Sequence, residues 1–389
     1  PTSIMLYLKL KITDSANADL PEADPVADSS IAFPINCIAS SLWKEVIVKV
    51  NGKVITKNTN LYHYRALIEK LLSFSGGVLT STGSRSGFFV DTADVDVHGA
   101  TIKAEDYKTN PGAKARFSMS CPSKTFEVID RIHTEICNQD VLIPPNTKIN
   151  IEFIRNNNKF CIMGHTAAKN YKLKILEAFL ESRVHKVSDS IVEGHKMTLE
   201  REPYLFTYRE VDLRYFGFQA NSSVLNLPNL YQDSRTPRRV VFGLVSSTGF
   251  SGSYAHNGLA FKNYKIREFI LRNHEKTIGR EITCDYENNL FVQAYQQFLT
   301  GSGFWDECNK GTIITKDIFK NSCNLYCFDL TSFHSAEDPV LDVQKGCNLS
   351  VEIKLSEPLT ENVQLICYLE IDSFLKIDKN NLVHLPSDS

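Results

Sequence analysis

Apolar and polar residues alternate strictly over several short stretches of the chain. The clearest stretch, residues 349–356, places leucine, valine and isoleucine side chains on one face and serine, glutamate, lysine and serine on the other. A period of two residues predicts a half-buried antiparallel strand. The same pattern recurs at residues 44–50, 148–154, 239–245, 264–271 and 362–371. Strands are therefore expected to outnumber helices.

The segments between these strands carry turn residues. Asn51 and Gly52 can both take the positive φ that a two-residue hairpin needs, so Val48 is expected to face Ile55 across a hairpin. Longer polar connections, of a length typical of functional or interface loops, are expected at residues 13–30, 105–115 and 216–238.

Two helices are predicted, at residues 61–74 and 289–300, because their apolar residues recur at helical spacing. Asn60 is expected to cap the first helix and Gly76-Gly77 to end it, while Gly301 ends the second. Each helix is expected to pack on a sandwich rather than to hold a cofactor.

The two predicted helices occupy equivalent places in the two halves of the chain. Each follows a strand, a tight turn and a short extended piece, and Lys53 aligns with Lys276 at an offset of 223 residues, the difference of the two positions. The halves also end alike, because residues 147–164 and 347–370 both contain an alternating strand, a polar turn and another apolar strand. This order of elements predicts an internal duplication of a β-rich unit.

A repeated antiparallel unit of about 160 to 220 residues fits a jelly roll better than an immunoglobulin-like sandwich of about 100 residues. We therefore expect an all-β fold of two tandem jelly-roll β-sandwiches, a double jelly roll, with short helices inserted in loops. The expected domains are residues 1–166 and 167–389, with the boundary in the short polar linker at residues 164–170.

Charge and hydropathy exclude two classes of partner. With 43 Lys and Arg against 45 Asp and Glu, the formal charge of -2 offers no footprint for a phosphate backbone, so direct sequence-specific nucleic-acid binding is not expected. The basic cluster Arg235, Arg238 and Arg239 is interpreted as a solvated strand entrance. No stretch of about 18 apolar residues and no signal-peptide pattern occurs, so we expect no membrane span and synthesis inside the cell.

Metal and redox chemistry are weakly indicated. The ten cysteines are expected to be mostly reduced and buried, with Cys323 and Cys327 on one face of a strand but too far apart to share a metal or a disulfide. Asp94, Asp96 and His98 would line one face of an extended segment, and a solvated acidic face is the preferred interpretation over a facial metal site.

Catalytic motifs are absent from the sequence. There is no H-x-H pair, GxSxG elbow, P-loop or HExxH, and His185, His195, His256 and His274 are expected to be surface or structural residues. We therefore predict no catalytic, cofactor-binding or metal-ligating residues, no cofactor, and no enzymatic activity.

An ordered set of segments carries a family resemblance. The first half contains LWKEVIVKVNGKVI and YHYRALIEKLLSF, and the second contains EREPYLFTYREVDLRYF, the stretch at residues 235–271, FVQAYQQFLTGSGFW, NLYCFDLT and GCNLSVEIKL. In this order they resemble the major capsid protein of Polintons (Mavericks), the large virus-like DNA transposons of animals, and of related adintoviruses. The resemblance covers essentially the whole chain.

The resemblance implies a homotrimer whose six sandwiches give a pseudo-hexameric capsomer. Such capsomers would tile an icosahedral virion shell, with a single jelly-roll penton protein at the vertices. Family chains carry a further N-terminal segment, including a strand, ahead of the piece that resembles IMLYLKLKIT. The first sandwich is therefore expected to lack its first strand. The alternative function is a carbohydrate- or receptor-binding β-sandwich module.

Overall fold

All six alternating stretches form strands, as predicted. The computed structural model describes residues 4–20, 32–92, 110–137, 143–144, 147–164, 170–304, 311–332, 336 and 345–386. In β16 (Cys347–Leu355) buried and half-buried residues alternate without a break. β11 (Arg239–Ser246) is buried at every residue, because it lies between two other strands inside the molecule.

The first half of the chain builds two three-stranded sheets and a two-stranded ribbon, in the orders β5-β1-β8, β4-β3-β6 and β2-β7. Its elements are β1 (Ile4–Thr13), β2 (Ala32–Pro34), α1 (Ile38–Ser41), β3 (Trp43–Val50), β4 (Lys53–Val54), α2 (Tyr62–Ser73), α3 (Gly76–Thr82), the 3-10 helix η1 (Gly83–Ser86), α5 (Pro111–Ser120), β5 (Phe126–Arg131), β6 (Ile149–Arg155), α6 (Asn158–Cys161), β7 (Ile162–Gly164) and β8 (Lys172–Ser182).

The second half builds two five-stranded sheets. One has the order β10-β16-β12-β13, and β14 also pairs with β12. The other has the order β15-β11-β17-β18, and β9 also pairs with β17. Besides β11 and β16, its elements are α7 (Asp189–Arg201), β9 (Tyr204–Phe218), β10 (Val224–Asp233), α8 (Ser247–Ser251), β12 (Ile266–Asn273), β13 (Lys276–Thr277), β14 (Ile282–Thr283), α9 (Val292–Gly301), α10 (Lys316–Asn321), β15 (Leu325–Asp329), β17 (Val363–Ile377) and β18 (Val383–His384).

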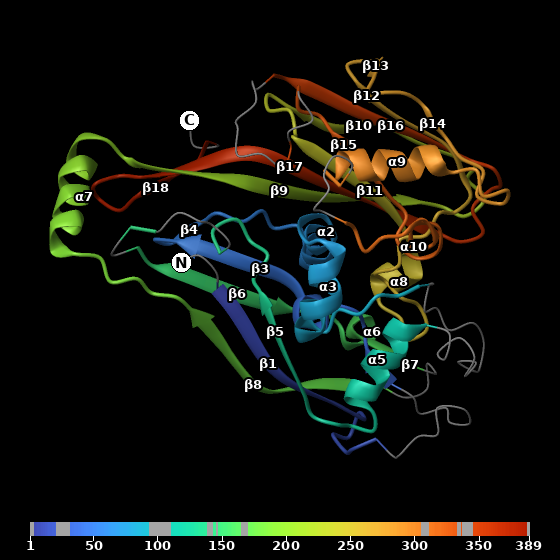
Figure 1. Cartoon of the computed structure of the whole chain (residues 1–389), viewed down its shortest axis with the longest axis horizontal. Helices are drawn as coiled ribbons and strands as arrows, with labels where there is room; N and C mark the ends of the chain where they lie inside the picture. The colour runs from blue at the N-terminus through green and yellow to red at the C-terminus, as the bar shows by residue number, and fades with distance from the viewer. Residues whose placement is uncertain are drawn as a thin grey trace.

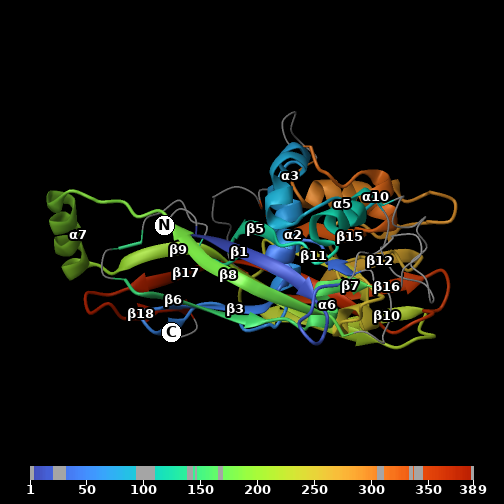
Figure 2. The same ribbon diagram turned by 90° about the horizontal axis from the view of Figure 1, so that it is seen from below.

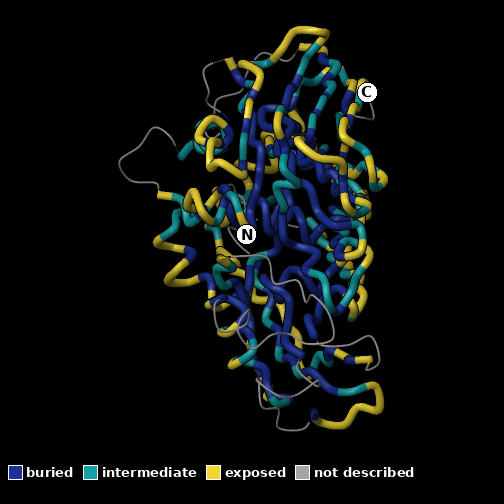
Figure 3. The backbone as a smooth tube through the Cα atoms, turned by 90° about the vertical axis from the view of Figure 1, so that its right-hand side faces the viewer, coloured by how far each residue is buried: buried dark blue, intermediate teal, exposed yellow. Residues whose placement is uncertain are grey.

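The two halves lie side by side along the long axes of their strands (Figure 1). Within the first half, β1 and β8 form one layer and β3 and β6 the other (Figure 2). The inward residues of these sheets belong to one continuous apolar core that also includes the second half, and buried backbone runs through the centre of the molecule (Figure 3).

The internal duplication is confirmed at the level of single residues. Val48 pairs with Ile151 in the first half, and Leu271, at the offset of 223, pairs with Val351 in the second. The amide of Ile55 donates to the carbonyl of Val48 at 3.0 Å, and the amide of Ile278 donates to that of Leu271 at 2.8 Å.

The tight turns of the two copies also match. Asn51 and Gly52 have φ of 47° and 88°, as predicted for the hairpin, and their counterparts His274 and Glu275 have φ of 46° and 69°. Each copy has a register shift at the start of its strand pair, between Trp43 and Glu45 and between Ile266 and Glu268. These positions again differ by 223.

Both predicted helices form, as α2 and α9, and α2 matches its predicted span within one residue at each end, but the residues predicted to cap and to stop it are wrong. Asn60 has a positive φ of 57° and does not cap α2, whose N-cap position is Leu61 without a side-chain hydrogen bond. The helix ends at Ser73, and Gly76 and Gly77 begin the next helix, α3, which Ser75 caps instead.

The predicted connection at residues 216–238 is also wrong, because it contains the end of β9 and the whole of strand β10, which pairs with β16. A register irregularity between Leu227 and Tyr231 interrupts this pairing around Pro228, and it hides the alternation in the sequence. Helices α5 and α7 were not predicted either.

The domain boundary at 166/167 stays a prediction. β8 lies beyond that boundary, yet it pairs with β1 over most of its length, from Ile4 opposite Ser182 to Thr13 opposite Lys172. We propose that the first sandwich includes β8 and that the division falls near α7.

Candidate functional site

Helix α2 lies between the two halves and joins them. The hydroxyl of Tyr64 donates to the carbonyl of Gly258 at 2.6 Å, across the junction. The Tyr64 ring has Phe160 of the first half and Phe250 and Phe261 of the second within 6.4 Å of its centroid. The apolar face of α2, which the sequence pattern predicts, therefore packs against the second half of the same chain.

The polar residues of α2 are buried with charged partners. Arg65 donates from Nε to Glu69 and from a terminal nitrogen to Glu135, both at 2.7 Å. His133 contacts Glu69 at 2.9 Å, and Lys70 donates to Asp130 at 2.7 Å. Because all of these groups are shielded from water, each charge depends on its partner.

These contacts fix the protonation of the α2 cluster. Burial alone would raise the pKa of Glu69, but the charge of Arg65 and the contact with His133 lower it to about 2. Burial lowers the pKa of His133, and the neighbouring carboxylates oppose that change without reversing it. At neutral pH the cluster therefore holds an ionised Glu69 and a neutral His133.

Strand β9 faces the first half with further charges. Lys57 donates to Glu210 at 2.7 Å and lies 3.5 Å from Asp212, so an ion pair connects the two halves. Arg235 contacts Glu210 from within the second half at 3.2 Å. The opposing charges explain why an acidic strand can be buried at this junction.

The interpretation of the arginine cluster as solvated is wrong. Arg238 and Arg239 are each only 2% exposed, and they pair with Asp372 at 3.0 Å and with Glu370 at 3.6 Å. Arg239 does begin strand β11, as predicted. Arg235 is half-buried and paired with Glu210 and Asp233, so all three arginines of the cluster have carboxylate partners.

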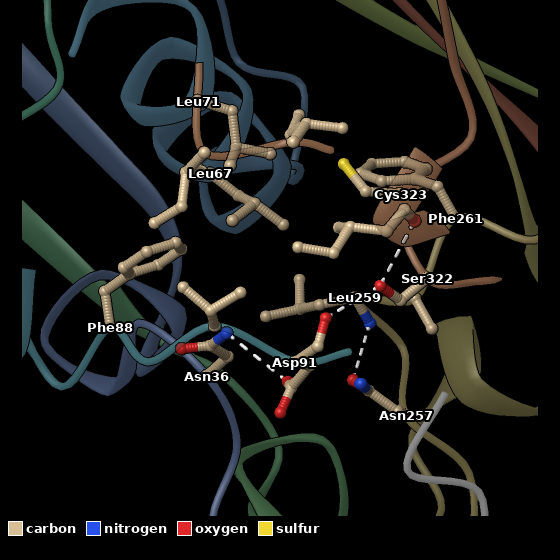
Figure 4. A pocket seen from close by; sticks show the side chains of 15 residues that line it. Asn36, Leu67, Leu71, Phe88, Asp91, Asn257, Leu259, Phe261, Ser322 and Cys323 are labelled. Atoms are coloured by element: carbon tan, nitrogen blue, oxygen red, sulfur yellow. Dashed lines mark hydrogen bonds between the residues drawn. The ribbon is translucent and has the colours of Figure 1, made fainter. Parts of the chain in front are cut away.

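A small cavity lies between the two halves, beside helix α2 (Figure 4). Leu67, Leu71 and Phe88 of the first half and Leu259 and Phe261 of the second line it. Its volume of about 50 Å³ suffices for a few water molecules and not for a metabolite.

The polar rim of this cavity is structural. Asp91 receives a hydrogen bond from Arg116 at 3.1 Å, and the Ser322 hydroxyl donates to the Asp91 carbonyl at 2.9 Å. Asn36 contacts the same carboxylate at 3.4 Å. These bonds tie the loop around Asp91 to both halves.

The other residues singled out in the sequence do not converge. Among the described residues, no group of three His, Cys, Asp or Glu side chains could hold a metal ion. Asp94, Asp96 and His98 lie outside the described residues. His195 lies on α7 and His274 at the β12–β13 turn, and both are exposed, as predicted.

The predicted burial is confirmed for the nine cysteines that the structure describes, which are all buried and free. The prediction that Cys323 and Cys327 share one face of a strand is wrong, because β15 begins at Leu325 and Cys323 lies ahead of it. Burial raises the pKa of Cys37 to about 11 and those of Cys161 and Cys323 to about 12. In the described part of the chain, no helix is long and apolar enough to cross a bilayer.

The outer surface carries the features that sequence reasoning missed. Helix α7 has no buried residue and stands at one extremity of the molecule, at the end of the long β9–β17 ribbon (Figure 1). Its Ile191 and Met197 are 49% and 62% exposed. A groove of about 500 Å³ separates the helix from Tyr204, Leu205 and Ile377 at the ribbon tip. Exposed apolar groups of this kind mark interaction surfaces.

The comparisons with known proteins address the fold. No protein-family model matches the sequence. An uncharacterized protein of Caenorhabditis elegans is 23% identical over 379 residues, which are 96% of this chain and 86% of that protein.

Solved structures of viral proteins are similar over nearly the whole chain. A chain of the Sputnik virophage is matched with a TM-score of 0.58 and 13% identity, covering 99% of this chain and 82% of that one. The Faustovirus major capsid protein is matched with a TM-score of 0.53 and 10% identity, covering 96% and 85%. Together with the two duplicated sandwiches, these similarities confirm that the fold is an all-β double jelly roll.

Proposed function

We propose that this chain is a major capsid protein that assembles with copies of itself into a viral shell. The observation that carries the proposal is the extent of the structural similarity: both sandwiches, and not one jelly roll, match the Faustovirus major capsid protein. Fold alone does not determine function, so the surface and interior of this chain must also fit the role.

The interior fits a structural role. The charged groups at the junction are paired with one another, the nine described thiols are buried, and the cavity between the halves is too small for a substrate. The proposal therefore includes no catalytic residue, no cofactor and no reaction.

The proposed capsomer is a homotrimer with a pseudo-hexameric outline. Two copies of one unit within a chain, related residue by residue through the offset of 223, let a threefold ring present six similar edges. Exposed apolar groups on α7 and β8 are candidates for contacts between copies. The Polinton-like origin, a single jelly-roll penton partner and a place in the virion are further parts of this proposal.

Solution mass tests the proposal directly. Size-exclusion chromatography with light scattering should give three chains of 43.9 kDa, about 132 kDa, and electron microscopy of the same fraction should show hexagonal particles. A monomer at every concentration would contradict the capsomer. A monomer that binds immobilised glycans would favour a carbohydrate- or receptor-binding module instead.

A further inference from the structure

One side of helix α7 differs from the rest of its surface. Val192 and Leu199 are the two half-buried residues of this helix, and its other residues are exposed. Seven residues correspond to two helical turns, so these two side chains lie on the same side. Both line the groove of about 500 Å³ at the tip of the β9–β17 ribbon, named here the α7 groove.

The ribbon tip and the first half supply further apolar lining. These residues are Pro144, Pro203, Tyr204, Leu205 and Ile377. Ile377 is buried, whereas Leu205 is 55% exposed, so a ligand in the groove would remove the Leu205 side chain from water. The volume of the groove lies within the range of about 300 to 1,000 Å³ that is typical of small-molecule sites.

The polar lining of the α7 groove carries more positive than negative charge. Lys196 of α7 and Lys379, which follows β17, line the groove together with one carboxylate, Glu202. Within the described part of the chain, neither lysine side chain forms an ion pair or a hydrogen bond. Lys57 at the junction of the halves, by contrast, contacts Glu210 at 2.7 Å. Two unpaired ammonium groups favour a ligand that brings negative charge.

The apolar and the cationic parts of the lining together select the class of ligand. An uncharged hydrocarbon would cover Leu205 but leave both lysines without a partner. A small hydrophilic anion would pair with the lysines but leave the apolar residues in water. A ligand that combines an apolar chain with an anionic head satisfies both parts.

We propose that the α7 groove binds an anionic amphiphile. Its apolar chain lies against Val192, Leu199 and Leu205, and its carboxylate or phosphate head lies near Lys196 and Lys379. A free fatty acid and an anionic lipid share this chemistry. The proposal is independent of the capsid role, because it uses no contact between copies of the chain.

Isothermal titration calorimetry on the full chain tests the proposal. The probe is dodecanoate, kept below its critical micelle concentration, and it should bind with a stoichiometry of one per chain. Decanoate, which is shorter by two methylenes, should bind about tenfold more weakly. Dodecyltrimethylammonium, which has the same chain and a cationic head, should bind at least about tenfold more weakly than dodecanoate.

A matched pair of variants on α7 tests the apolar wall. Leu199→Asn should weaken dodecanoate binding by at least about tenfold, because the side chain lines the groove. Met197→Asn should bind dodecanoate normally, because Met197 is 62% exposed and does not line the groove. The helix has no buried residue, so both variants should keep the melting temperature of the parent chain.

A second pair of variants tests the cationic part. Lys196→Gln/Lys379→Gln should weaken dodecanoate binding by about tenfold and leave the binding of dodecyltrimethylammonium unchanged or tighter. Lys172→Gln/Lys186→Gln removes the same amount of charge from two exposed lysines that do not line the groove. This control should bind dodecanoate as the parent chain does.

Flotation with vesicles distinguishes the two sources of such a ligand. Vesicles of phosphatidylcholine are compared with vesicles that also contain phosphatidylserine. Flotation that requires phosphatidylserine and is lost in Leu199→Asn would identify the ligand as a membrane lipid. Dodecanoate binding without flotation would identify it as a free fatty acid.

Four results would overturn the proposal. The first is the absence of both dodecanoate binding and flotation. The second is equal affinity for dodecanoate and dodecyltrimethylammonium, which would show that the lysines do not select the ligand. The third is equal binding by Leu199→Asn and Met197→Asn, which would place the ligand elsewhere. The fourth is slowed hydrogen exchange of α7 that appears only as the mass rises, which would assign the groove to a second copy.

Discussion

Arg65 is the buried charge whose removal should destabilise the protein most clearly. Its guanidinium is in contact with Glu69 and Glu135 at 2.7 Å, Arg65 itself is 7% exposed, and the Glu135 side chain is fully buried. Replacing Arg65 by leucine leaves two carboxylates without their cation. Breaking a buried pair in this way costs about 3–5 kcal/mol in the free energy of unfolding.

Guanidinium denaturation followed by circular dichroism at pH 7 measures this loss. The matched control is Lys9→Leu, which breaks the exposed 3.5 Å pair with Glu127 and should cost at most about 1 kcal/mol. The double variant Arg65→Leu/Glu135→Leu should recover part of the loss, since it removes one stranded carboxylate. Equal losses for Arg65→Leu and Lys9→Leu would refute the view that the junction depends on desolvated pairs.

Three further predictions follow from the described geometry. Burial lowers the pKa of His63 to about 3, so between pH 6.5 and 3 only the unfolded chain binds a proton at this residue. The free energy of unfolding should therefore fall by up to about 1.4 kcal/mol for each pH unit of acidification in this range. His63→Phe should flatten this dependence, as measured by denaturation at a series of pH values. Gly258→Ala would place a Cβ 2.5 Å from the Phe160 ring and should lower the melting temperature, whereas Gly194→Ala, on α7 in open space, should raise it slightly. Ellman's reagent at pH 8 should leave the nine described thiols largely unmodified until denaturant is added, and early labelling of Cys161 or Cys323 mapped by mass spectrometry would contradict their burial.

Much of the β architecture can be predicted from local patterns, because a strand with one buried face has apolar residues at alternate positions of its own sequence. The hairpin at Asn51-Gly52 and its counterpart at His274-Glu275 illustrate how far this extends, since the second turn lacks the glycine yet keeps the geometry. β10 escaped prediction because Pro228 and the nearby register irregularity disturb its period of two.

The charged junction could not be predicted from the sequence. Arg238 and its partner Asp372 are 134 positions apart, so nothing near the arginine indicates that it will be buried. The same holds for Arg65 and Glu135, which the fold brings together from α2 and the segment after β5. Local composition favours water for such residues, and only the tertiary arrangement supplies the opposite charge.

The position of helix α7 also has a consequence for engineering. The helix has no buried residue, and the strands on either side of it are held by different partners, β8 by β1 and β9 by β17. A protease that cuts within α7 should therefore leave two fragments that remain associated through the sheets and the junction. A foreign peptide inserted at the same position should be displayed at the extremity of the molecule, where neither sandwich has to rearrange to accommodate it.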